Sequence, residues 1–435
     1  MNILSITAGA AGMYCGSCLR DNALAVELMR RGHRVTLLPL YTPTNPDETN
    51  VSRNRVLFGG ISVYLQQYVP FFRRSPRILD RLLDSPRVIN AFASRSISTD
   101  PKMLGDMTIS MLEGDRGVLR KEFDKLLEWI ADEPAPDVIN LPNSLLIGLA
   151  APLKRALQRP ICCTLQGEDL FLNGLTEPYR TRAIDLIRQQ IPDVDLFLSV
   201  SDYYVPIMSK MIGIPTERIE VVPLGINLAG YDRRQPGGDP FRVGFFARIA
   251  PEKGLHVLAE AYKKLRARTP SARIRFDAAG YMWAAQAPYL EEIKAGLRQA
   301  GLGDEFTYHG AVDRNGKLAF LRTLDVMSVP APDEPKGVSV LEAMGVGVPV
   351  VQPRWGSFTE MVEKTGGGLL VAPGDADALA DGLYQLWKDR DLAERLGQRG
   401  FDGVREHYSI ERSTDRLIKA YSDVVGSSKR PGSPA

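Results

Sequence analysis

Short apolar runs alternate with amphipathic segments along the whole chain. Several of the runs contain no polar residue, as at Leu196–Leu198 and Val243–Phe246. Strands of this kind are typical of parallel sheets that helices cover on both faces. The pattern predicts six strands in each half of the chain, near 2–7, 34–40, 137–142, 161–166, 196–201 and 219–225, and near 242–248, 272–280, 305–312, 326–332, 349–354 and 367–373.

A polar stretch rich in glycine and proline separates the two sets of strands. In a chain of 435 residues, such a stretch near the middle predicts a boundary between two α/β domains. Two Rossmann-like domains with parallel sheets place a cleft at the carboxyl ends of their strands, so we expect the chemistry there. The expected divisions are an N-terminal domain over 1–226 with an elaborated segment at about 51–135, a linker over 227–240, a C-terminal domain over 241–408, a helix over 409–426 that packs back on the first domain, and a disordered tail over 427–435.

Composition narrows the class of protein. The chain is 44% hydrophobic and 24% charged with a net charge of +2, which is typical of a globular protein and gives no general attraction to nucleic acid. No apolar run reaches the roughly 18–20 residues of a membrane span, and the first residues read as a buried strand. The four cysteines are too few for a disulfide framework. We therefore expect a cytoplasmic protein, at most peripheral to the inner face of the membrane.

The loop from Arg248 to Gly254 lies between a strand and the start of a helix. Backbone N–H groups at a helix start, together with the cations of Arg248 and Lys253, suit the negative charge of a diphosphate. The other interpretation is an ordinary solvated loop, and the residues alone leave the two open.

A second cluster runs from Glu334 to Glu342. Gly337 and Val338 mark the entry into a helix whose first-turn amides would be free to contact a ligand. Glu342 lies among apolar residues, where a carboxylate usually has a partner, and both glutamates can accept from pairs of hydroxyl groups. The alternative is that Glu342 sits on an exposed helix face.

These elements resemble the retaining GT-B glycosyltransferases of family 4, the group of glycogen synthase and related mannosyltransferases. The resemblance covers nearly the whole chain and depends on the Arg-x-x-Pro-Glu-Lys-Gly element and the Glu-x7-Glu element, with Gly356 and Glu360 in support. It implies a hexosyltransferase of glycan biosynthesis that takes its sugar from a nucleotide diphosphate donor.

The resemblance also implies roles for individual residues. Arg248 and Lys253 would bind the diphosphate, Glu334 the transferred sugar and Glu342 the ribose, and the first three would carry catalysis. The backbone from Gly310 to Val312 would lie along the base. Transfer would retain the anomeric configuration and need neither a metal nor a further cofactor.

The first half matches the family less closely. Gly16 falls at the second glycine of the family's first loop, while Cys15 stands at the first. Gln166 stands where the family often has a histidine, so this residue can bind a sugar hydroxyl but cannot carry a proton at neutral pH. Arg20 and Asp21 are expected either to reach the cleft or to pair on the surface.

Residues 64–95 combine aromatic and arginine side chains. This segment could hold a lipid-linked or anionic acceptor at a membrane face, and the acceptor of the chain is expected to be a glycan, a lipid-linked molecule or a small molecule. The simpler interpretation is a helical cap with a solvated arginine face.

Three alternatives to a transferase stay open. One is a non-catalytic nucleotide-sugar-binding protein, and another is an epimerase or phosphorylase of GT-B fold. The third is a redox or metal protein that uses Cys15 and Cys18.

Overall fold

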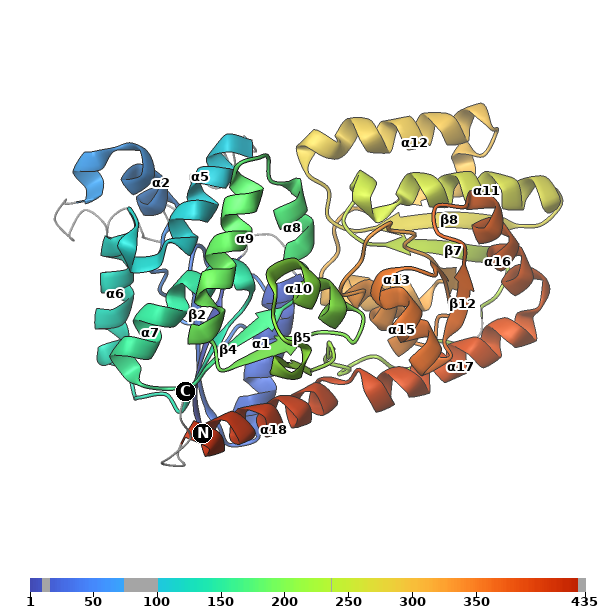
Figure 1. Cartoon of the computed structure of the whole chain (residues 1–435). Coiled ribbons are helices and arrows are strands. Elements are labelled where there is room, and N and C mark those ends of the chain that lie inside the picture. Colours follow the sequence, from blue (N-terminus) through green and yellow to red (C-terminus); the bar gives the residue numbers. More distant parts are fainter. Residues whose placement is uncertain (10–15, 74–100, 236, 429–435) are drawn as a thin grey trace. The chain divides into compact units, whose positions relative to one another are not determined.

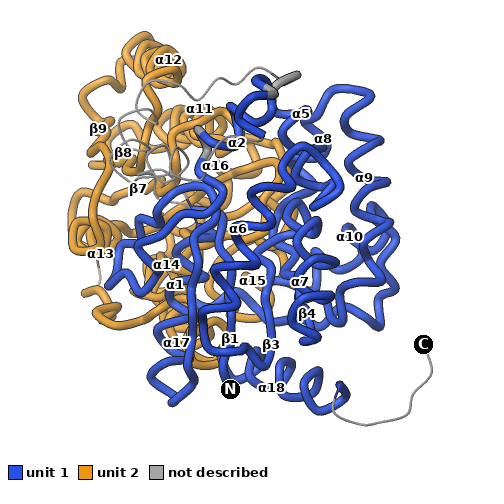
Figure 2. The backbone as a smooth tube through the Cα atoms, turned by 90° about the vertical axis from the view of Figure 1, so that its left-hand side faces the viewer, with its two compact units in different colours: residues 1–225, 413–435 blue, residues 226–412 orange. Residues whose placement is uncertain are grey.

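The computed structural model describes residues 1–9, 16–73, 101–235 and 237–428. The chain forms two compact units, which Figure 2 shows in two colours: unit 1 comprises residues 1–225 and 413–435, and unit 2 comprises residues 226–412. Each unit contains one six-stranded parallel sheet (Figure 1). The prediction of an α/β fold with two parallel sheets is confirmed.

The sheet of unit 1 has the order β2-β1-β3-β4-β5-β6. Its strands are β1 (Asn2–Thr7), β2 (Arg34–Pro39), β3 (Val138–Leu141), β4 (Ile161–Leu165), β5 (Leu196–Ser199) and β6 (Ile219–Val221). The helices are α1 (Gly16–Arg30), α2 (Gly60–Tyr68), α5 (Pro101–Leu112), α6 (Arg120–Ala131), α7 (Ala150–Leu157), α8 (Glu168–Gly174), α9 (Tyr179–Gln190), α10 (Tyr204–Ile212) and α18 (Ile410–Ser428), with short 3-10 helices η1 (Pro70–Arg73), η2 (Gly114–Arg116), η3 (Ser144–Leu149), η4 (Ile191–Asp193) and η5 (Thr216–Arg218).

The main core of unit 1 lies between its sheet and the helices that follow β2. Alternate residues of β4, among them Cys163 and Leu165, pack there with Phe123 of α6 and Tyr204 of α10. Burial of these apolar surfaces is the main favourable contribution to folding. The core fixes the central strands, whose carboxyl ends carry the polar residues described below.

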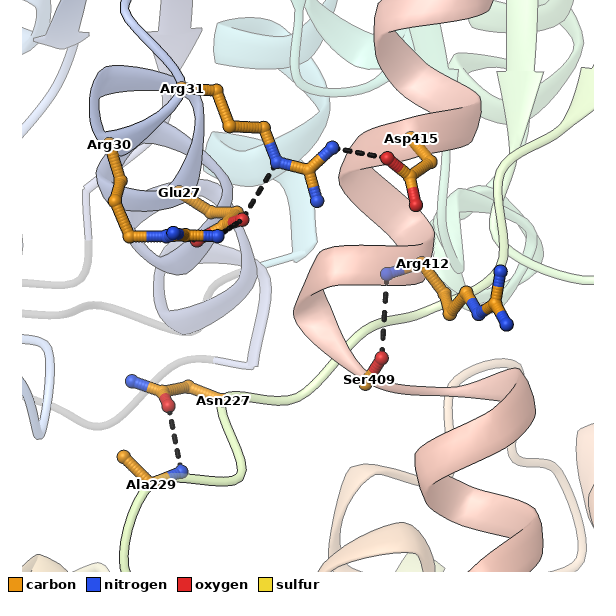
Figure 3. Close-up of polar contacts among 8 residues, drawn as sticks. All are labelled: Glu27, Arg30, Arg31, Asn227, Ala229, Ser409, Arg412 and Asp415. Carbon is orange, nitrogen blue, oxygen red and sulfur yellow. Dashed lines mark hydrogen bonds and ion pairs between the residues drawn. The ribbon is translucent and has the colours of Figure 1, made fainter.

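Helix α18 begins in unit 2 and continues in unit 1 from Ser413, where it packs beside α1 (Figure 3). Arg31 forms ion pairs with Asp415 of α18 and, at 2.8 Å, with Glu27 of α1. The residues of the expected disordered tail from 429 onward lie outside the described ranges.

The sheet of unit 2 has the order β12-β11-β10-β7-β8-β9. Its strands are β7 (Phe241–Phe246), β8 (Ile274–Ala279), β9 (Phe306–Tyr308), β10 (Val326–Met327), β11 (Val350–Pro353) and β12 (Gly368–Val371). The helices are α11 (Leu255–Arg268), α12 (Ala287–Gln299), α13 (Arg314–Arg322), α14 (Val338–Gly345), α15 (Gly356–Thr365), α16 (Ala376–Lys388) and α17 (Arg390–His407), with 3-10 helices η6 (Pro251–Lys253), η7 (Ala284–Gln286) and η8 (Gly303–Glu305).

The stretch expected as a linker packs within unit 2. Tyr231 and Arg234 are buried, and the Arg234 amide donates to the carbonyl of Val346 at 2.8 Å. A side chain of Asn227 closes a local turn by accepting from the Ala229 amide at 2.9 Å (Figure 3). The stretch is therefore held in place by contacts within unit 2.

Several strands end earlier than the apolar pattern predicts. β6 stops at Val221 and β10 at Met327, although apolar residues continue beyond both. Pro223 and Pro330 follow within three residues, and proline has no N–H to donate to a sheet. Among the described residues, none of the helices combines the length and the apolar composition that crossing a membrane requires.

Candidate functional site

The two predicted donor loops leave neighbouring strands of unit 2. β7 and β10 pair in parallel, with Val243 opposite Val326 and Gly244 opposite Met327. The loop after β7 carries Lys253, and the loop after β10 carries Glu334. Because parallel strands end at the same edge of a sheet, the two loops meet there.

Lys253 and Glu334 form an ion pair at this edge. The Lys253 ammonium donates to Oε2 of Glu334 at 2.6 Å, and the amides of Lys336 and Gly337 each donate to Oε1 at 3.1 Å. Burial raises the pKa of the Glu334 carboxyl, but the ion pair and the two amides outweigh burial and hold that pKa below its ordinary value. Glu334 is therefore ionised at neutral pH.

The Lys253 loop is also fixed at its helix end. Gly254 has a φ of +78°, and a Cβ there would come within 2.3 Å of the Pro330 carbonyl oxygen. Only glycine fits such an approach without a shift of the backbone. Arg248 at the start of the loop is exposed and forms an ion pair with Glu252.

The expectation of free amides at the start of α11 is wrong for His256. The His256 amide donates to the Tyr289 hydroxyl at 3.1 Å. The amides of Val257 and Leu258 donate to the Gly254 carbonyl at 2.9 and 3.1 Å. The sequence did not reveal this because Tyr289 comes from α12, a separate helix.

The start of α14 has the same N-cap arrangement as that of α11, but among the described residues its second amide, that of Ser339, has no partner like the one His256 has. Gly337 is the N-cap residue, and its carbonyl accepts from the amides of Val340 and Leu341 at 3.0 and 3.2 Å. In the described ranges, no group accepts from the amides of Val338 and Ser339. These two amides are thus available to a ligand beside Glu334.

Glu342 lies on α14, 6% exposed, and has two partners. Its Oε1 accepts from the Lys317 ammonium at 2.6 Å and from the Tyr231 hydroxyl at 3.0 Å. The prediction that a carboxylate in this apolar setting has a partner is confirmed, and the alternative of an exposed helix face is wrong. Neither partner was singled out from the sequence, although a lysine on the buried face of α13 is a usable signal for a buried anion.

Gly310 and Val312, predicted to line the base, lie in the loop between β9 and α13. The Gly310 carbonyl accepts from the Gly280 amide at 2.9 Å, which ties this loop to the end of β8. Asp313 caps α13 by accepting from the Gly316 amide at 2.7 Å. The loop is therefore ordered by contacts within unit 2.

A third loop, between β11 and α15, closes on the backbone of Glu334. The Ser357 amide and hydroxyl donate to the Glu334 carbonyl at 3.0 and 2.8 Å. Gly356 has a φ of +61°, and a Cβ there would lie 2.7 Å from the same carbonyl oxygen. Sequence analysis singled out Gly356 but not Ser357 or its neighbour Trp355.

In unit 1 the predicted substrate residue Gln166 follows β4 and is 4% exposed. Its Nε2 donates to the Pro142 carbonyl at 2.6 Å, so that its Oε1 faces elsewhere. Within the described part of the chain, three buried oxygens after β3, β4 and β5 have no hydrogen-bond partner: Asn143 Oδ1, Gln166 Oε1 and Ser201 Oγ. Buried polar atoms in native proteins are normally paired, so such a group marks a place where a ligand or water binds.

Glu168 holds the Gln166 loop. Its Oε2 accepts from the Gln166 amide at 2.6 Å, and its Oε1 accepts from the Ser144 amide at 2.8 Å. The Tyr204 hydroxyl donates to Oε2 at 3.3 Å. Burial raises the pKa of this carboxyl, although these hydrogen bonds act in the opposite direction.

Gly16 is the first residue of α1, and Cys15 lies outside the described residues. Arg20 and Asp21 form an ion pair at 3.2 Å, as one of the two expectations predicted, but both residues are buried, 4% exposed, and so do not pair on the surface. Cys162 and Cys163 are fully buried in β4, where burial raises the pKa of each thiol.

The segment suggested for membrane contact is described only as far as residue 73. Three of its aromatic side chains are exposed on α2 and η1: Tyr64, Tyr68 and Phe71. Arg73 donates to the carbonyls of Gln66 and Gln67 at 2.8 and 3.0 Å and so closes the end of α2. Residues 74–95 lie outside the described ranges.

Family models match both parts of the chain. Residues 232–402 match the model described as Glycosyl transferases group 1, and residues 111–229 match the model described as Glycosyltransferase Family 4. The first match contains Lys253, Glu334 and Glu342, and the second contains Gln166.

Curated relatives are similar over part of their length. The putative colanic acid biosynthesis glycosyltransferase WcaL of Salmonella typhimurium is 30% identical over 270 residues, which cover 60% of this chain and 64% of WcaL. The GDP-mannose-dependent alpha-(1-6)-phosphatidylinositol monomannoside mannosyltransferase of Mycobacterium tuberculosis is 28% identical over 265 residues, covering 56% and 64%. The chain thus spans just under two thirds of the length of these relatives.

Solved structures share the fold at low identity. Sucrose-phosphate synthase from Thermosynechococcus elongatus has a TM-score of 0.70 at 17% identity, covering 98% of this chain and all of that one. Anabaena HepE in complex with UDP-glucose has a TM-score of 0.64 at 17% identity, covering 97% and 100%. The two parallel α/β units are those of the GT-B fold.

Proposed function

We propose that this chain, with its glycosyltransferase group 1 and family 4 domains, transfers a hexose from a nucleotide diphosphate sugar to a hydroxyl group with retention of configuration. Unit 2 binds the donor, and unit 1 binds the acceptor. The observation that carries the proposal is the Lys253–Glu334 pair at 2.6 Å, with the amides of Val338 and Ser339 beside it. Fold alone would not support a function, because one fold serves many reactions.

In the proposed reaction the bond between the anomeric carbon and the diphosphate oxygen breaks, and its electron pair leaves with the diphosphate. The acceptor oxygen bonds to the same face of the sugar and gives its proton to the departing phosphate oxygen. Lys253 and Arg248 stabilise the negative charge that develops on the diphosphate, and Glu334 orients the sugar by accepting from its hydroxyls. Because these two cations supply the positive charge that the departing diphosphate needs, the proposed reaction requires no metal and no further cofactor.

Glu342 and the Gly310–Val312 loop bind the nucleoside in this proposal. One oxygen of Glu342 is occupied by Lys317 and Tyr231, and a carboxylate has further acceptor capacity for ribose hydroxyls. The HepE structures contain UDP or UDP-glucose, and the mycobacterial relative is named for GDP-mannose. UDP and GDP are therefore the first nucleotides to test.

The acceptor is a glycan, a lipid-linked sugar or a small molecule, and Gly16 and Gln166 contact substrate in unit 1. The exposed aromatic side chains of Tyr64, Tyr68 and Phe71 support peripheral contact with a membrane. Sedimentation with anionic vesicles tests this contact. Recovery of all the protein in the supernatant, as without vesicles, would rule it out.

The main test is calorimetric titration with UDP, GDP and ADP, followed by nucleotide release from the matching sugar donors. Lys253→Ala removes a charged hydrogen-bond donor, so we expect the Kd of the bound nucleotide to rise about 30-fold, or about 2 kcal/mol. Lys263→Ala is the matched control. Lys263 lies on α11, the helix that follows the Lys253 loop, and it forms an ion pair with Glu260 of the same helix. Binding by neither wild type nor control would refute the donor site. Binding without release from any donor or acceptor mixture would favour a non-catalytic binding protein.

A further inference from the structure

Trp355 is the one large hydrophobic side chain that is exposed among the described residues of unit 2. Its exposed fraction is 47%, yet two contacts fix its place in the loop. The indole Nε1 donates to Oδ1 of Asp333 at 3.0 Å, and its amide donates to the Pro353 carbonyl at 2.7 Å. A tryptophan held this way presents a large, ordered apolar surface to whatever binds beside it.

The Trp355 loop is attached to the residue proposed to bind the sugar. Ser357 donates twice to the Glu334 carbonyl, and Gly356 allows that close approach. Asp333, which holds the indole, directly precedes Glu334. The loop that carries the indole and the loop that carries the Glu334 carboxylate are therefore joined by hydrogen bonds.

The order of strands places Trp355 away from the proposed base loop. Along the carboxyl edge of the sheet, the loops after β11, β10, β7 and β9 carry Trp355, Glu334, Lys253 and the Gly310–Val312 segment in that order, with β8 before β9. From β11 to β9 there are four strand spacings, about 19 Å. If the base lies beside β9 and the diphosphate beside Lys253, the sugar of the donor lies near the loops after β10 and β11.

We propose that Trp355 is a stacking platform for the transferred sugar. A pyranose has hydroxyls around its rim and a patch of C–H groups on its face. The indole packs against that face while Glu334 accepts from the rim hydroxyls, and Asp333 positions the indole. This inference depends on the proposed function and adds the residue that distinguishes a sugar-bearing donor from the bare nucleotide.

The test compares nucleotides with and without the sugar: UDP against UDP-glucose, and GDP against GDP-mannose. In Trp355→Ala we expect the Kd of the sugar nucleotide to rise about tenfold, or about 1.4 kcal/mol, while that of the nucleotide stays within about twofold. Trp355→Phe keeps an aromatic face and should restore most of the affinity. Trp387→Ala, on α16 where the ring lies tilted against that of Tyr384, is the control and should change neither Kd.

Two outcomes would overturn the inference while the donor site stands. If Trp355→Ala binds the sugar nucleotide as wild type does, the indole has no part in sugar binding. If it loses affinity equally for nucleotide and sugar nucleotide, the indole stacks on the base instead. Absence of any nucleotide binding by wild type would be a different failure, that of the proposed function itself. Intrinsic fluorescence gives a second readout, since a sugar on the indole should change emission in wild type and not in Trp355→Ala.

Discussion

The carboxyl edges of the two sheets carry polar groups of different kinds. In unit 2, the Glu334 carboxylate has a partner at both oxygens, one of them the Lys253 ammonium. In unit 1, the oxygens of Asn143, Gln166 and Ser201 are neutral and lack partners among the residues described. The ion pair of Lys253 and Glu334 thus lies at the edge of unit 2, while the edge of unit 1 carries these neutral oxygens beside the Glu168 carboxylate.

This difference shows how one architecture can serve two ligands. Cations and free amides suit a diphosphate, because they interact with negative charge before and during its departure. The amide oxygens of Asn143 and Gln166 suit a ligand that donates hydrogen bonds, and the Ser201 hydroxyl can donate or accept. This difference is consistent with the proposed function, in which unit 2 binds the diphosphate and unit 1 binds a hydroxyl-bearing ligand.

The largest effect should come from removing the charge of Glu334. Glu334→Gln keeps the size of the side chain but loses the ion pair and the second anionic oxygen. We expect nucleotide release from the donor to slow about 100-fold, or about 2.7 kcal/mol. The Kd of the bare nucleotide should stay the same or fall, because Lys253 no longer has a competing anion. Steady-state release and calorimetry measure the two quantities.

Glu260→Gln is the control for this substitution. Glu260 pairs with Lys263 at 2.7 Å on the exposed side of α11, so its loss should leave both quantities unchanged. Wild-type turnover in Glu334→Gln would show that this carboxylate has no role in the reaction. The ion pair in unit 2 would then have no bearing on function.

The next effect tests the attachment of the Trp355 loop to Glu334. Gly356→Ala places a methyl group 2.7 Å from the Glu334 carbonyl oxygen in a left-handed backbone conformation. We expect the free energy of unfolding to fall by about 2–3 kcal/mol, from backbone strain plus displacement of the loop. Chemical unfolding followed by circular dichroism measures the change.

Gly374→Ala separates the two causes. Gly374 has a φ of +69°, but a Cβ there would meet no heavy atom within 4 Å. This variant should show backbone strain alone, about 1 kcal/mol. Equal losses of unfolding free energy in the two variants would mean that the Trp355 loop can shift at little cost. That loop would then not hold Glu334 in place.

The sequence identified the strands because buried apolar runs are a local signal. Lys253 and Glu334 could be singled out because each belongs to a short local motif, and the structure brings the two together because the strands before their loops, β7 and β10, pair in parallel. The ends of β6 and β10 were predicted too far along, since apolar residues continue past the last residue of each strand.

The hydrogen-bond partners of the site residues could not be predicted from the sequence. Lys317 and Tyr289 reach Glu342 and the start of α11 from separate helices, and no spacing along the chain links them. Likewise, the orientation of the Gln166 amide depends on the Pro142 carbonyl of the neighbouring strand. Such contacts follow from packing in three dimensions.

A third prediction uses pH to contrast the two edges. The pKa of Glu334 is lowered from its ordinary 4.5, so its contribution to stability is present above pH 4.5 and is lost as pH falls through the folded pKa. Burial raises the pKa of Glu168 above 4.5, so the fold favours its protonated form and loses stability as pH rises from 4.5 through the folded pKa. Each slope is at most about 1.4 kcal/mol per pH unit.

Glu334→Gln and Glu168→Gln should therefore change the pH profile of stability in opposite senses. Relative to wild type, the first variant is least stable above pH 4.5 and approaches wild type in acid. The second gains on wild type as pH rises above 4.5. Unfolding curves at pH 3 to 8, roughly the range that spans both carboxyl titrations, measure the differences. Slopes of the same sign would show that the two carboxyls occupy similar electrostatic surroundings.

The smallest effect is expected at Gln166, where the neutral edge is tested directly. Gln166→Leu removes the Oε1 acceptor together with the Nε2 donor to Pro142. An unpaired buried acceptor costs about as much as one lost hydrogen bond, roughly 1 kcal/mol, so stability should change by less than about 0.5 kcal/mol. Nucleotide release should slow about fivefold, or about 1 kcal/mol, because a sugar hydroxyl loses its acceptor.

Gln189→Leu makes the same substitution on the exposed side of α9 and should alter neither stability nor release. The Kd of the bare nucleotide should be unchanged in both variants, since the proposed nucleotide site lies in unit 2. A loss of nucleotide affinity in Gln166→Leu would mean that unit 1 also contacts the charged part of the donor. A clear loss of stability without slower release would make Gln166 a structural residue, because its carbonyl would then have a partner, such as a buried water, that supports the fold rather than the ligand.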